Sequence, residues 1–243
     1  MSKFSLVLPT YNEAPHIKAI CRDIIGVLEA RNTVFEIIIV DDNSADGTWR
    51  LARELSLSDA RIRILRRKRR QGLASAVADG WSIANGDILG VMDADFQHPP
   101  HTLTAMLDMM SRRDDIDIVI AGRHFSALIM SGLNPLRAVI SRLACLFAGI
   151  LLPRAVTGIN DPMSGFFIFR KKVIEASAIK PIGYKVLLEV LVKGSYRRRE
   201  EILYTFNRRR KGKSKMGILQ CAMSCFHMIK LAFLYPPCRN SCF

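Results

Sequence analysis

The sequence lacks several motifs that define common nucleotide-binding and exported proteins. It has no Gly-x4-Gly-Lys-Ser/Thr segment, which excludes a P-loop NTPase. No Gly-x-Gly-x-x-Gly follows the first predicted strand, which disfavours a dinucleotide-dependent oxidoreductase. Repeats and low-complexity tracts are also absent, which excludes a repeat architecture. The apolar run before Pro9 is too short for a signal peptide, so we expect no export.

Acidic side chains are scarce relative to basic ones. The 243 residues include 22 Asp and Glu against 36 Lys and Arg, for a net charge of +14. This excess favours an anionic partner, which could be a nucleic acid, a phosphorylated small molecule or an anionic membrane surface. Aromatic residues are absent from the basic run Arg61–Arg70, which argues against a nucleic-acid-binding module. Aromatic residues do flank the second basic run, Arg197–Arg210, so that alternative stays open.

The first half of the chain alternates strand-like and helix-like segments. Strands are predicted at Phe4–Leu8, Phe35–Val40, Ile62–Leu65, Asp87–Met92 and Asp117–Ala121, with helices at Glu13–Ala30, Asp46–Leu57, Leu73–Ala84 and Leu103–Ser111. The alternation predicts an α/β fold with a mainly parallel, Rossmann-like sheet and helices on both faces. Ligands bind such sheets beyond the carboxyl ends of the strands.

The second half is less regular and richer in apolar helices. Helices are predicted at Pro135–Leu152, Tyr184–Val192 and Met216–Tyr235, and strands at Ser164–Phe169 and Glu201–Phe206. We place the boundary between the two halves near Gln97–Pro100.

The most specific local feature is Asp93-Ala94-Asp95-Phe96-Gln97, which directly follows a predicted buried strand. Two carboxylates one residue apart can share Mg²⁺ or Mn²⁺, with phosphate oxygens of a substrate completing the ligand set. The alternative is a solvated acidic turn, but the position of the motif within the strand–helix alternation favours the metal.

Two further loops follow predicted strands. Val40 is followed by two aspartates, and the carboxylate of Asp42 can take ribose hydroxyls or a base edge. Asp46 can instead cap the next helix. After the first strand, Tyr11 can stack on a base and Glu13 can accept a hydrogen bond from one. The alternative there is a turn made of helix-start residues.

Together these motifs resemble the family-2 glycosyltransferases of the GT-A fold, and most closely the dolichyl- (polyprenyl-) phosphate mannosyltransferase group. The resemblance covers about residues 4–215. Besides the loops above, the matching stretches are Ala121-Gly-Arg123, Asp161-Pro-Met-Ser-Gly-Phe-Phe167, Gly183-Tyr-Lys-Val-Leu-Leu-Glu189 and Phe206-Asn-Arg-Arg-Arg-Lys-Gly-Lys-Ser-Lys215.

The resemblance implies a role for each matching residue. The nucleoside pocket would be lined by Pro9, Tyr11, Glu13, Val40 and Asp42. The divalent ion on the donor diphosphate would be held by Asp93, Asp95 and Gln97, with Ala94 against the nucleotide. Asp95 and Arg123 would be catalytic. Donor phosphates would also meet Arg209 and Lys215, and the acceptor phosphate would meet Arg123, Arg137, Ser141 and Arg209.

The implied reaction is metal-dependent, inverting transfer of a hexose from a nucleoside-diphosphate sugar to dolichyl or polyprenyl phosphate, with mannose from GDP-mannose as the first expectation. A glucose donor or a glycan hydroxyl acceptor is the alternative. The Gln-x-x-Arg-Trp motif and the Glu-Asp-type base motif of hydroxyl-using relatives are missing. A phosphate acceptor is already anionic and needs no general base. Asp161 is the best candidate for an alternative base, but its position before Pro162 favours a structural turn residue.

The resemblance also suggests how the chain is divided. Residues 1–215 would form the glycosyltransferase domain, with a nucleotide-binding half at 1–98 and an acceptor half at 99–215. Residues 216–243 would form an amphipathic, membrane-associated tail.

The Met216–Tyr235 run is long enough to cross a bilayer. However, Gln220, Ser224, His227 and Lys230 recur at helical spacing as a polar stripe, which suits a helix lying in the membrane interface. An ordinary amphipathic core helix is the alternative. The basic runs favour an anionic leaflet. We therefore expect peripheral or weakly integral attachment at the cytoplasmic face of a membrane, and no nucleic-acid partner.

Overall fold

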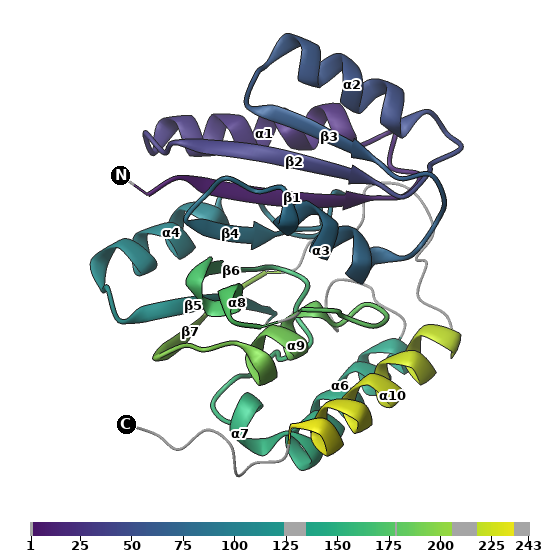
Figure 1. Ribbon diagram of the computed structural model, residues 1–243, viewed down its shortest axis with the longest axis vertical. Helices are drawn as coiled ribbons and strands as arrows, with labels where there is room; N and C mark the ends of the chain where they lie inside the picture. Colours follow the sequence, from purple (N-terminus) through teal and green to yellow (C-terminus); the bar gives the residue numbers. More distant parts are fainter. Residues whose placement is uncertain (1, 124–134, 178, 206–217, 236–243) are drawn as a thin grey trace.

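The structure is a computed structural model that describes residues 2–123, 135–177, 179–205 and 218–235, with only the backbone described at 135–141 and 218–222. Within these residues, seven strands form one sheet in the order β3-β2-β1-β4-β6-β5-β7 (Figure 1). Their bounds are β1 Phe4–Thr10, β2 Phe35–Asp41, β3 Ile62–Arg66, β4 Ile88–Val91, β5 Ile116–Arg123, β6 Phe167–Arg170 and β7 Arg198–Tyr204. Only β6 runs antiparallel to its neighbours, β4 and β5, so the predicted mainly parallel sheet is confirmed.

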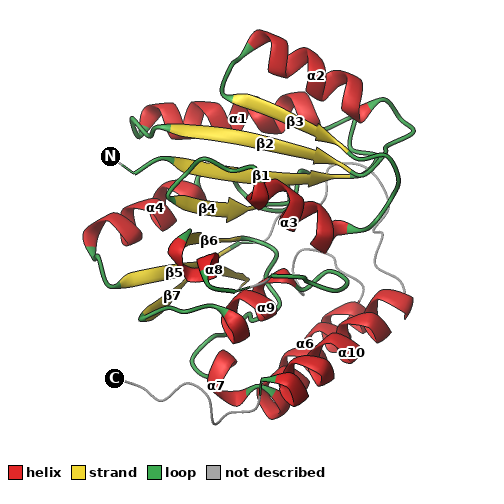
Figure 2. Cartoon of the chain, viewed as in Figure 1, coloured by secondary structure: helices red, strands yellow, loops and turns green. Residues whose placement is uncertain are grey.

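Helices cover both faces of the sheet, as the alternation predicts (Figure 2). One face carries α1 (Ile17–Ala30), α2 (Thr48–Ser58) and α4 (Thr102–Arg112), and the other carries α3 (Leu73–Ser82), α8 (Lys172–Glu175) and α9 (Val186–Lys193). The sequence of β2 explains this arrangement, because successive side chains of a strand point to opposite faces. Ile37 and Ile39 belong to the first hydrophobic cluster, whereas Ile38 and Val40 belong to the second.

Close packing of α3 on the sheet depends on a glycine. A Cβ atom added to Gly80 would lie 2.6 Å from the Val7 side chain of β1. Only a residue without a side chain lets the helix approach this closely.

A third group of helices lies beside the sheet. It consists of α6 (Pro135–Leu151), α7 (Pro153–Val156) and α10 (Ile218–Leu234). In Figure 1, α6 and α10 run side by side. A separate hydrophobic cluster that includes Ala148, Met228 and Leu231 joins them to Leu188 of α9. This group is therefore attached to the sheet through α9.

The first strand extends two residues past its predicted end, through Pro9 to Thr10. The pairing of β1 with β4 ends at Val7, whereas its pairing with β2 continues to Thr10. The carbonyl oxygen of Val7 accepts a hydrogen bond on the β4 side, and that of Thr10 accepts one on the β2 side. Because the backbone polar groups of successive residues point to alternate sides of a strand, those of Pro9 point to the β4 side. Because β4 has ended there, the missing N–H of proline costs no ladder hydrogen bond.

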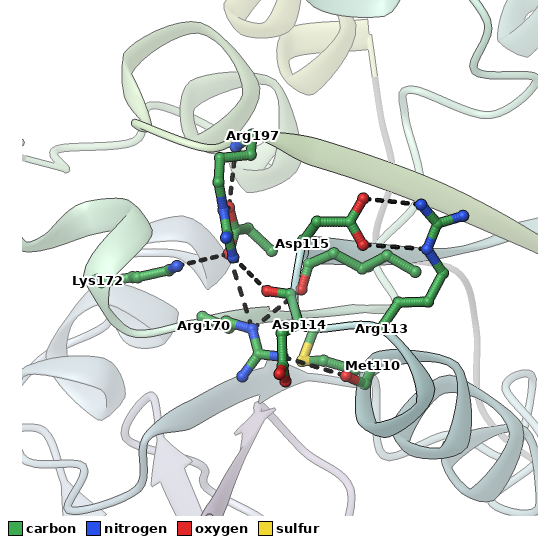
Figure 3. Close-up of polar contacts among 9 residues, drawn as sticks. Met110, Arg113, Asp114, Asp115, Arg170, Lys172 and Arg197 are labelled. Carbon is green, nitrogen blue, oxygen red and sulfur yellow. Dashed lines mark hydrogen bonds and ion pairs between the residues drawn. The ribbon is translucent and has the colours of Figure 1, made fainter.

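A charged cluster ties the amino ends of β5 and β7 together (Figure 3). The carboxylate of Asp117, only 1% exposed, lies 2.8 Å from Lys172 Nζ and accepts hydrogen bonds from the backbone and guanidinium of Arg197 at 2.9–3.1 Å. Burial alone would raise the pKa of Asp117, but the bonds from Arg197 and Lys172 lower it to about 2. The cluster lies at the opposite end of the strands from the candidate site, so we assign it to stability.

Candidate active site

Three loops leave the carboxyl ends of β1, β2 and β4, and each contains a non-glycine residue in the left-handed region. The φ angles are 53° at Asn12, 60° at Asn43 and 64° at Phe96. Asparagine tolerates this conformation, but a buried phenylalanine rarely adopts it. Strained backbone of this kind persists where the surrounding structure imposes it, and it is concentrated at functional sites. Because β1 pairs in parallel with both β2 and β4, the three predicted binding loops meet at one edge of the sheet.

The first two loops are locked to each other by hydrogen bonds. The amide of Asn12 donates to Ser44 Oγ at 2.9 Å, and the amide of Glu13 donates to Thr48 Oγ1 at 2.9 Å. Asp46 accepts hydrogen bonds from Ala14 and from the first amide of α2, both at 3.0 Å. The N-cap position of α2 is Gly47, so the prediction that Asp46 caps this helix is wrong in position, although Asp46 does accept the first amide of α2 and also joins the loops.

The two adjacent aspartates after β2 have different partners. Asp41 is buried and accepts hydrogen bonds from Ser44 at 2.9 and 2.6 Å, so it shapes its own loop. Asp42, which is 4% exposed, accepts hydrogen bonds from the amides of Gln71 and Gly72 at 2.8 Å. Asp42 therefore fixes the turn that enters α3, and its predicted contact with the nucleoside stays a prediction.

The remaining predicted nucleoside-pocket residues lie around these loops. The ring of Tyr11 is half-buried and is covered by the guanidinium of Arg70, 4.1 Å from the ring centroid. Glu13 is buried and pairs with His16 Nδ1 at 2.8 Å. Pro9 and Val40 are buried in the sheet. The structure thus gathers this set at one edge, and their contact with a nucleoside stays a prediction.

The acidic loop after β4 presents one exposed and one buried carboxylate. The Asp93 side chain is 36% exposed and lies 3.6 Å from His98 Nε2. Asp95 is 6% exposed and accepts a hydrogen bond from the Gln97 amide at 3.1 Å. Ala94 between them is buried. The backbone turn at Phe96 thus holds both carboxylates and Gln97 within one short loop.

His98 links this loop to the end of β7. Its Nδ1 atom lies 2.6 Å from the Tyr204 hydroxyl, and its ring packs against Phe166 and Tyr204. Burial raises the pKa of the Tyr204 phenol, so the hydroxyl stays protonated and can donate to the histidine. No sequence motif points to Tyr204, because residues 98 and 204 are brought together only by the fold.

The donor set of the acidic loop fits a divalent cation. Its side chains supply carboxylate and amide oxygens, which Mg²⁺ and Mn²⁺ prefer. Within the described part of the chain, no three His, Cys, Asp or Glu side chains are grouped closely enough to hold a metal ion. Two carboxylates and one amide would leave positions around such an ion for substrate phosphate and water, and the binding of a metal by Asp93, Asp95 and Gln97 stays a prediction.

Arg123, at the end of β5, forms a two-point ion pair with Asp161. Its Nε and terminal nitrogen lie 2.5 and 2.9 Å from the two carboxylate oxygens. Burial favours the neutral acid, but the Arg123 guanidinium lowers the pKa of Asp161 below its usual value. Asp161 is therefore ionised and holds Arg123 in place. The Asp161 carbonyl also accepts the Ser164 amide, which agrees with the turn predicted there.

The other predicted phosphate-binding residues lie in less described parts of the chain. Arg137 and Ser141 fall within α6, so their predicted position one helical turn apart is confirmed, while their side chains are outside the described residues. Arg209 and Lys215 also lie outside the described residues.

The loops after β1 and β2 interlock at the strand ends, near the acidic loop after β4 and the ion-paired Arg123, which is an arrangement typical of α/β enzymes that bind a ligand at this edge of the sheet. The chain belongs to glycosyl transferase family 2, whose family model matches residues 5–177.

Curated relatives of the chain include dolichol-phosphate mannosyltransferases. It is 39% identical over 214 residues to that of Pyrococcus furiosus, covering 88% of this chain and 59% of the relative. It is 34% identical over 225 residues to that of Saccharomyces cerevisiae, covering 88% of this chain and 81% of the relative. The chain thus spans about three fifths of the archaeal relative and most of the yeast one.

Solved structures share the fold at low sequence identity. Glucosyl-3-phosphoglycerate synthase from Mycobacterium tuberculosis, in complex with Mn²⁺, UDP and glucosyl-3-phosphoglycerate, matches with a TM-score of 0.72 and 17% identity, covering 99% of this chain and 82% of that one. Mannosyl-3-phosphoglycerate synthase from Rubrobacter xylanophilus matches with a TM-score of 0.72 and 16% identity, covering 100% and 77%. The GT-A-like fold expected from the sequence is therefore confirmed.

Proposed function

We propose that the chain transfers a hexose, with mannose from GDP-mannose as the first candidate, to the phosphate of dolichol or another polyprenol. The observation that carries this proposal is the Asp93–Gln97 loop at the strand ends. Its ordered carboxylates suit a metal-bound nucleoside-diphosphate donor. The names of the most similar curated relatives support the mannosyl donor and the lipid acceptor.

The donor half of the reaction is a matter of binding and charge neutralisation. Asp93, Asp95 and Gln97 would hold Mg²⁺ or Mn²⁺, which supplies positive charge to the diphosphate leaving group. Tyr11, Glu13 and Asp42 would orient the nucleoside from the two interlocked loops. Fixed positioning of this kind lowers the barrier because the reacting groups are held before the chemical step.

The acceptor half needs no proton abstraction, since a lipid phosphate is anionic near neutral pH. Arg123 would contact the reacting phosphate, with Arg137, Ser141 and Arg209 as further acceptor-phosphate contacts. Asp161 is already occupied in the ion pair with Arg123. This engagement supports an attack by the lipid phosphate itself rather than by a hydroxyl group that Asp161 would activate.

We also propose that α6 and α10 rest on the cytoplasmic face of an anionic membrane. Both helices expose large apolar side chains: Leu143, Leu146 and Ile150 on α6, and Met223, Phe226, Ile229, Phe233 and Leu234 on α10. Exposed apolar surface on two adjacent helices is typical of an interaction surface. A search of the described helices finds none whose length and hydropathy meet the requirements of a membrane span.

A transfer assay with labelled donors tests the proposal. The full chain is incubated with Mn²⁺, a short polyprenyl phosphate and either GDP-mannose or UDP-glucose, and the lipid product is identified by mass spectrometry. The proposal expects a polyprenyl phosphohexose whose formation stops when the metal is chelated. A lipid fraction that carries no hexose from either donor, with Mn²⁺ present, would contradict it.

A further inference from the structure

Lys185 belongs to the Gly183–Glu189 motif, and no role has been assigned to it so far. It directly precedes α9 and is only partly exposed. Its ammonium donates one hydrogen bond, to the carbonyl oxygen of Met163 at 3.1 Å. No carboxylate in the described part of the chain forms an ion pair with it. Since an ammonium carries three donors, at least two can serve a ligand.

A single loop brings Lys185 to the candidate active site. Residues 161–165 begin at Asp161, which binds Arg123, and continue through Met163, whose carbonyl binds Lys185. They end at Gly165, where an added Cβ atom would lie 3.6 Å from Asp93 Oδ2. The loop therefore places the lysine beside both the acidic loop and the ion-paired arginine.

The charge balance around Lys185 favours an anionic ligand. Asp161 neutralises Arg123, whereas among the described residues the Lys185 ammonium has only a neutral carbonyl at hydrogen-bond distance. Burial lowers the pKa of Lys185, and the positive charge of Arg123 lowers it further, although Asp161 and Asp93 oppose the shift. A partly buried cation without a counter-charge in contact is unfavourable unless an anion binds it.

We propose that Lys185 binds a phosphate group of the substrates and is a further phosphate-binding residue of this active site. The proposal rests on the function proposed above. The phosphate comes either from the nucleoside diphosphate or from the lipid acceptor, because both would approach the space between Asp93 and Arg123. An ammonium suits either phosphate, since it acts as a compact charge with rotatable donors.

The experiment compares Lys185→Met and Lys185→Arg with the wild-type chain. Lys171→Met is the matched control, because Lys171 also donates from Nζ to a backbone carbonyl, that of Ala84 at 3.2 Å, away from the site. Calorimetry with Mg²⁺-pyrophosphate and with Mn²⁺-GDP measures donor binding. The KM for a short polyprenyl phosphate measures acceptor binding.

We expect Lys185→Met to weaken one of these two affinities about 10- to 100-fold, the effect of losing one charge-assisted hydrogen bond. Weaker binding of pyrophosphate and GDP would assign Lys185 to the diphosphate, and a higher KM for polyprenyl phosphate would assign it to the lipid phosphate. Lys185→Arg should restore part of the loss, and Lys171→Met should match the wild type. Affinities and KM of Lys185→Met all within twofold of wild type would overturn the proposal.

A measurement without any variant covers the case in which Lys185→Met does not fold. Lysine acylation of the wild-type chain is quantified by mass spectrometry without ligand, with Mg²⁺-pyrophosphate and with a short polyprenyl phosphate. Protection of Lys185 but not of Lys171 by either ligand supports the proposal, and equal labelling of Lys185 in all three samples overturns it. A chain that binds pyrophosphate through Lys185 but transfers no sugar would refute the proposed function and leave this inference intact.

Discussion

Replacing Asp161 with asparagine keeps the shape of the side chain and removes the charge that Arg123 faces. The Asp161 side chain is 6% exposed and that of Arg123 is 17% exposed, so water can replace only part of the lost contact. Removing one partner of a buried ion pair costs about 3–5 kcal/mol, because the other charge is left uncompensated. The pair here is partly accessible, so we expect about 3 kcal/mol less free energy of unfolding for Asp161→Asn.

Urea unfolding at pH 7 measures this loss, and the matched control is Asp115→Asn. Asp115 also forms a two-point pair, with Arg113 at 3.0 and 2.9 Å, but both groups are exposed (Figure 3). Exposed pairs contribute little, so the control should unfold almost like the wild type. Because the pKa of Asp161 is lowered in the folded state, its contribution should be present above about pH 4 and disappear as the pH falls through the folded pKa. If both variants lost the same free energy of unfolding, the reasoning from burial would be refuted.

Three further predictions follow from other parts of the molecule. The pKa of Asp117 falls from 3.8 in the unfolded chain to about 2 in the folded one, so Asp117→Asn should lower the free energy of unfolding at pH 7 by about 2 kcal/mol. Urea unfolding should also show that the variant loses less stability than the wild type between pH 4 and 2, and an unchanged pH profile would contradict this. Arg137→Ala should raise the KM for polyprenyl phosphate about 10- to 100-fold and leave the Kd of GDP unchanged, whereas Asp42→Ala should raise the Kd of GDP and leave that KM unchanged. Equal effects of Arg137→Ala on both constants would show that α6 is not part of the acceptor site. Phe226 and Phe233 are 60% and 81% exposed, so their joint replacement by aspartate should weaken sedimentation with anionic vesicles more than tenfold without altering the melting temperature; undiminished binding would show that another surface meets the membrane.

The alternating part of the fold was predictable because its signals are local. Strand β2 is a continuous β-branched run, and its burial on both faces is what such a run indicates. The same pattern fixed the positions of the acidic loop and of the two loops that precede it along the chain. Their meeting at one edge follows from the parallel arrangement alone.

Features that depend on distant contacts were not predictable. A strand is predicted at Ser164–Phe169 and the structure has β6 at Phe167–Arg170. Its antiparallel direction comes from its insertion between β4 and β5, which no local pattern encodes. The Arg123–Asp161 pair joins residues 38 positions apart. Sequence motifs alone predict separate roles for the two residues: Arg123 at the reaction centre, and Asp161 as a turn residue or a base.

The polar stripe of α10 is not uniformly exposed to solvent. His227, predicted as part of the stripe, is 1% exposed, and its Nε2 atom lies 3.2 Å from a carboxylate oxygen of Glu189 on α9. Lys230, one turn further along, is exposed. One part of the stripe therefore faces the protein, while Phe226 and Phe233 of the same helix are exposed. The contact of α10 with a membrane stays a prediction.

The proposed function depends on a divalent ion that the two carboxylates after β4 would hold. The most direct measurement compares the rate of polyprenyl phosphohexose formation by the wild type, by Asp95→Asn and by Asp87→Asn as Mn²⁺ is varied. Asp87 is the control because it lies just before β4, at the opposite end of the same strand, where it accepts the Lys3 amide at 3.1 Å. We expect Asp95→Asn to fold but to lose transfer at every Mn²⁺ concentration, and Asp87→Asn to behave like the wild type. Wild-type rates from Asp95→Asn at limiting Mn²⁺ would contradict this expectation.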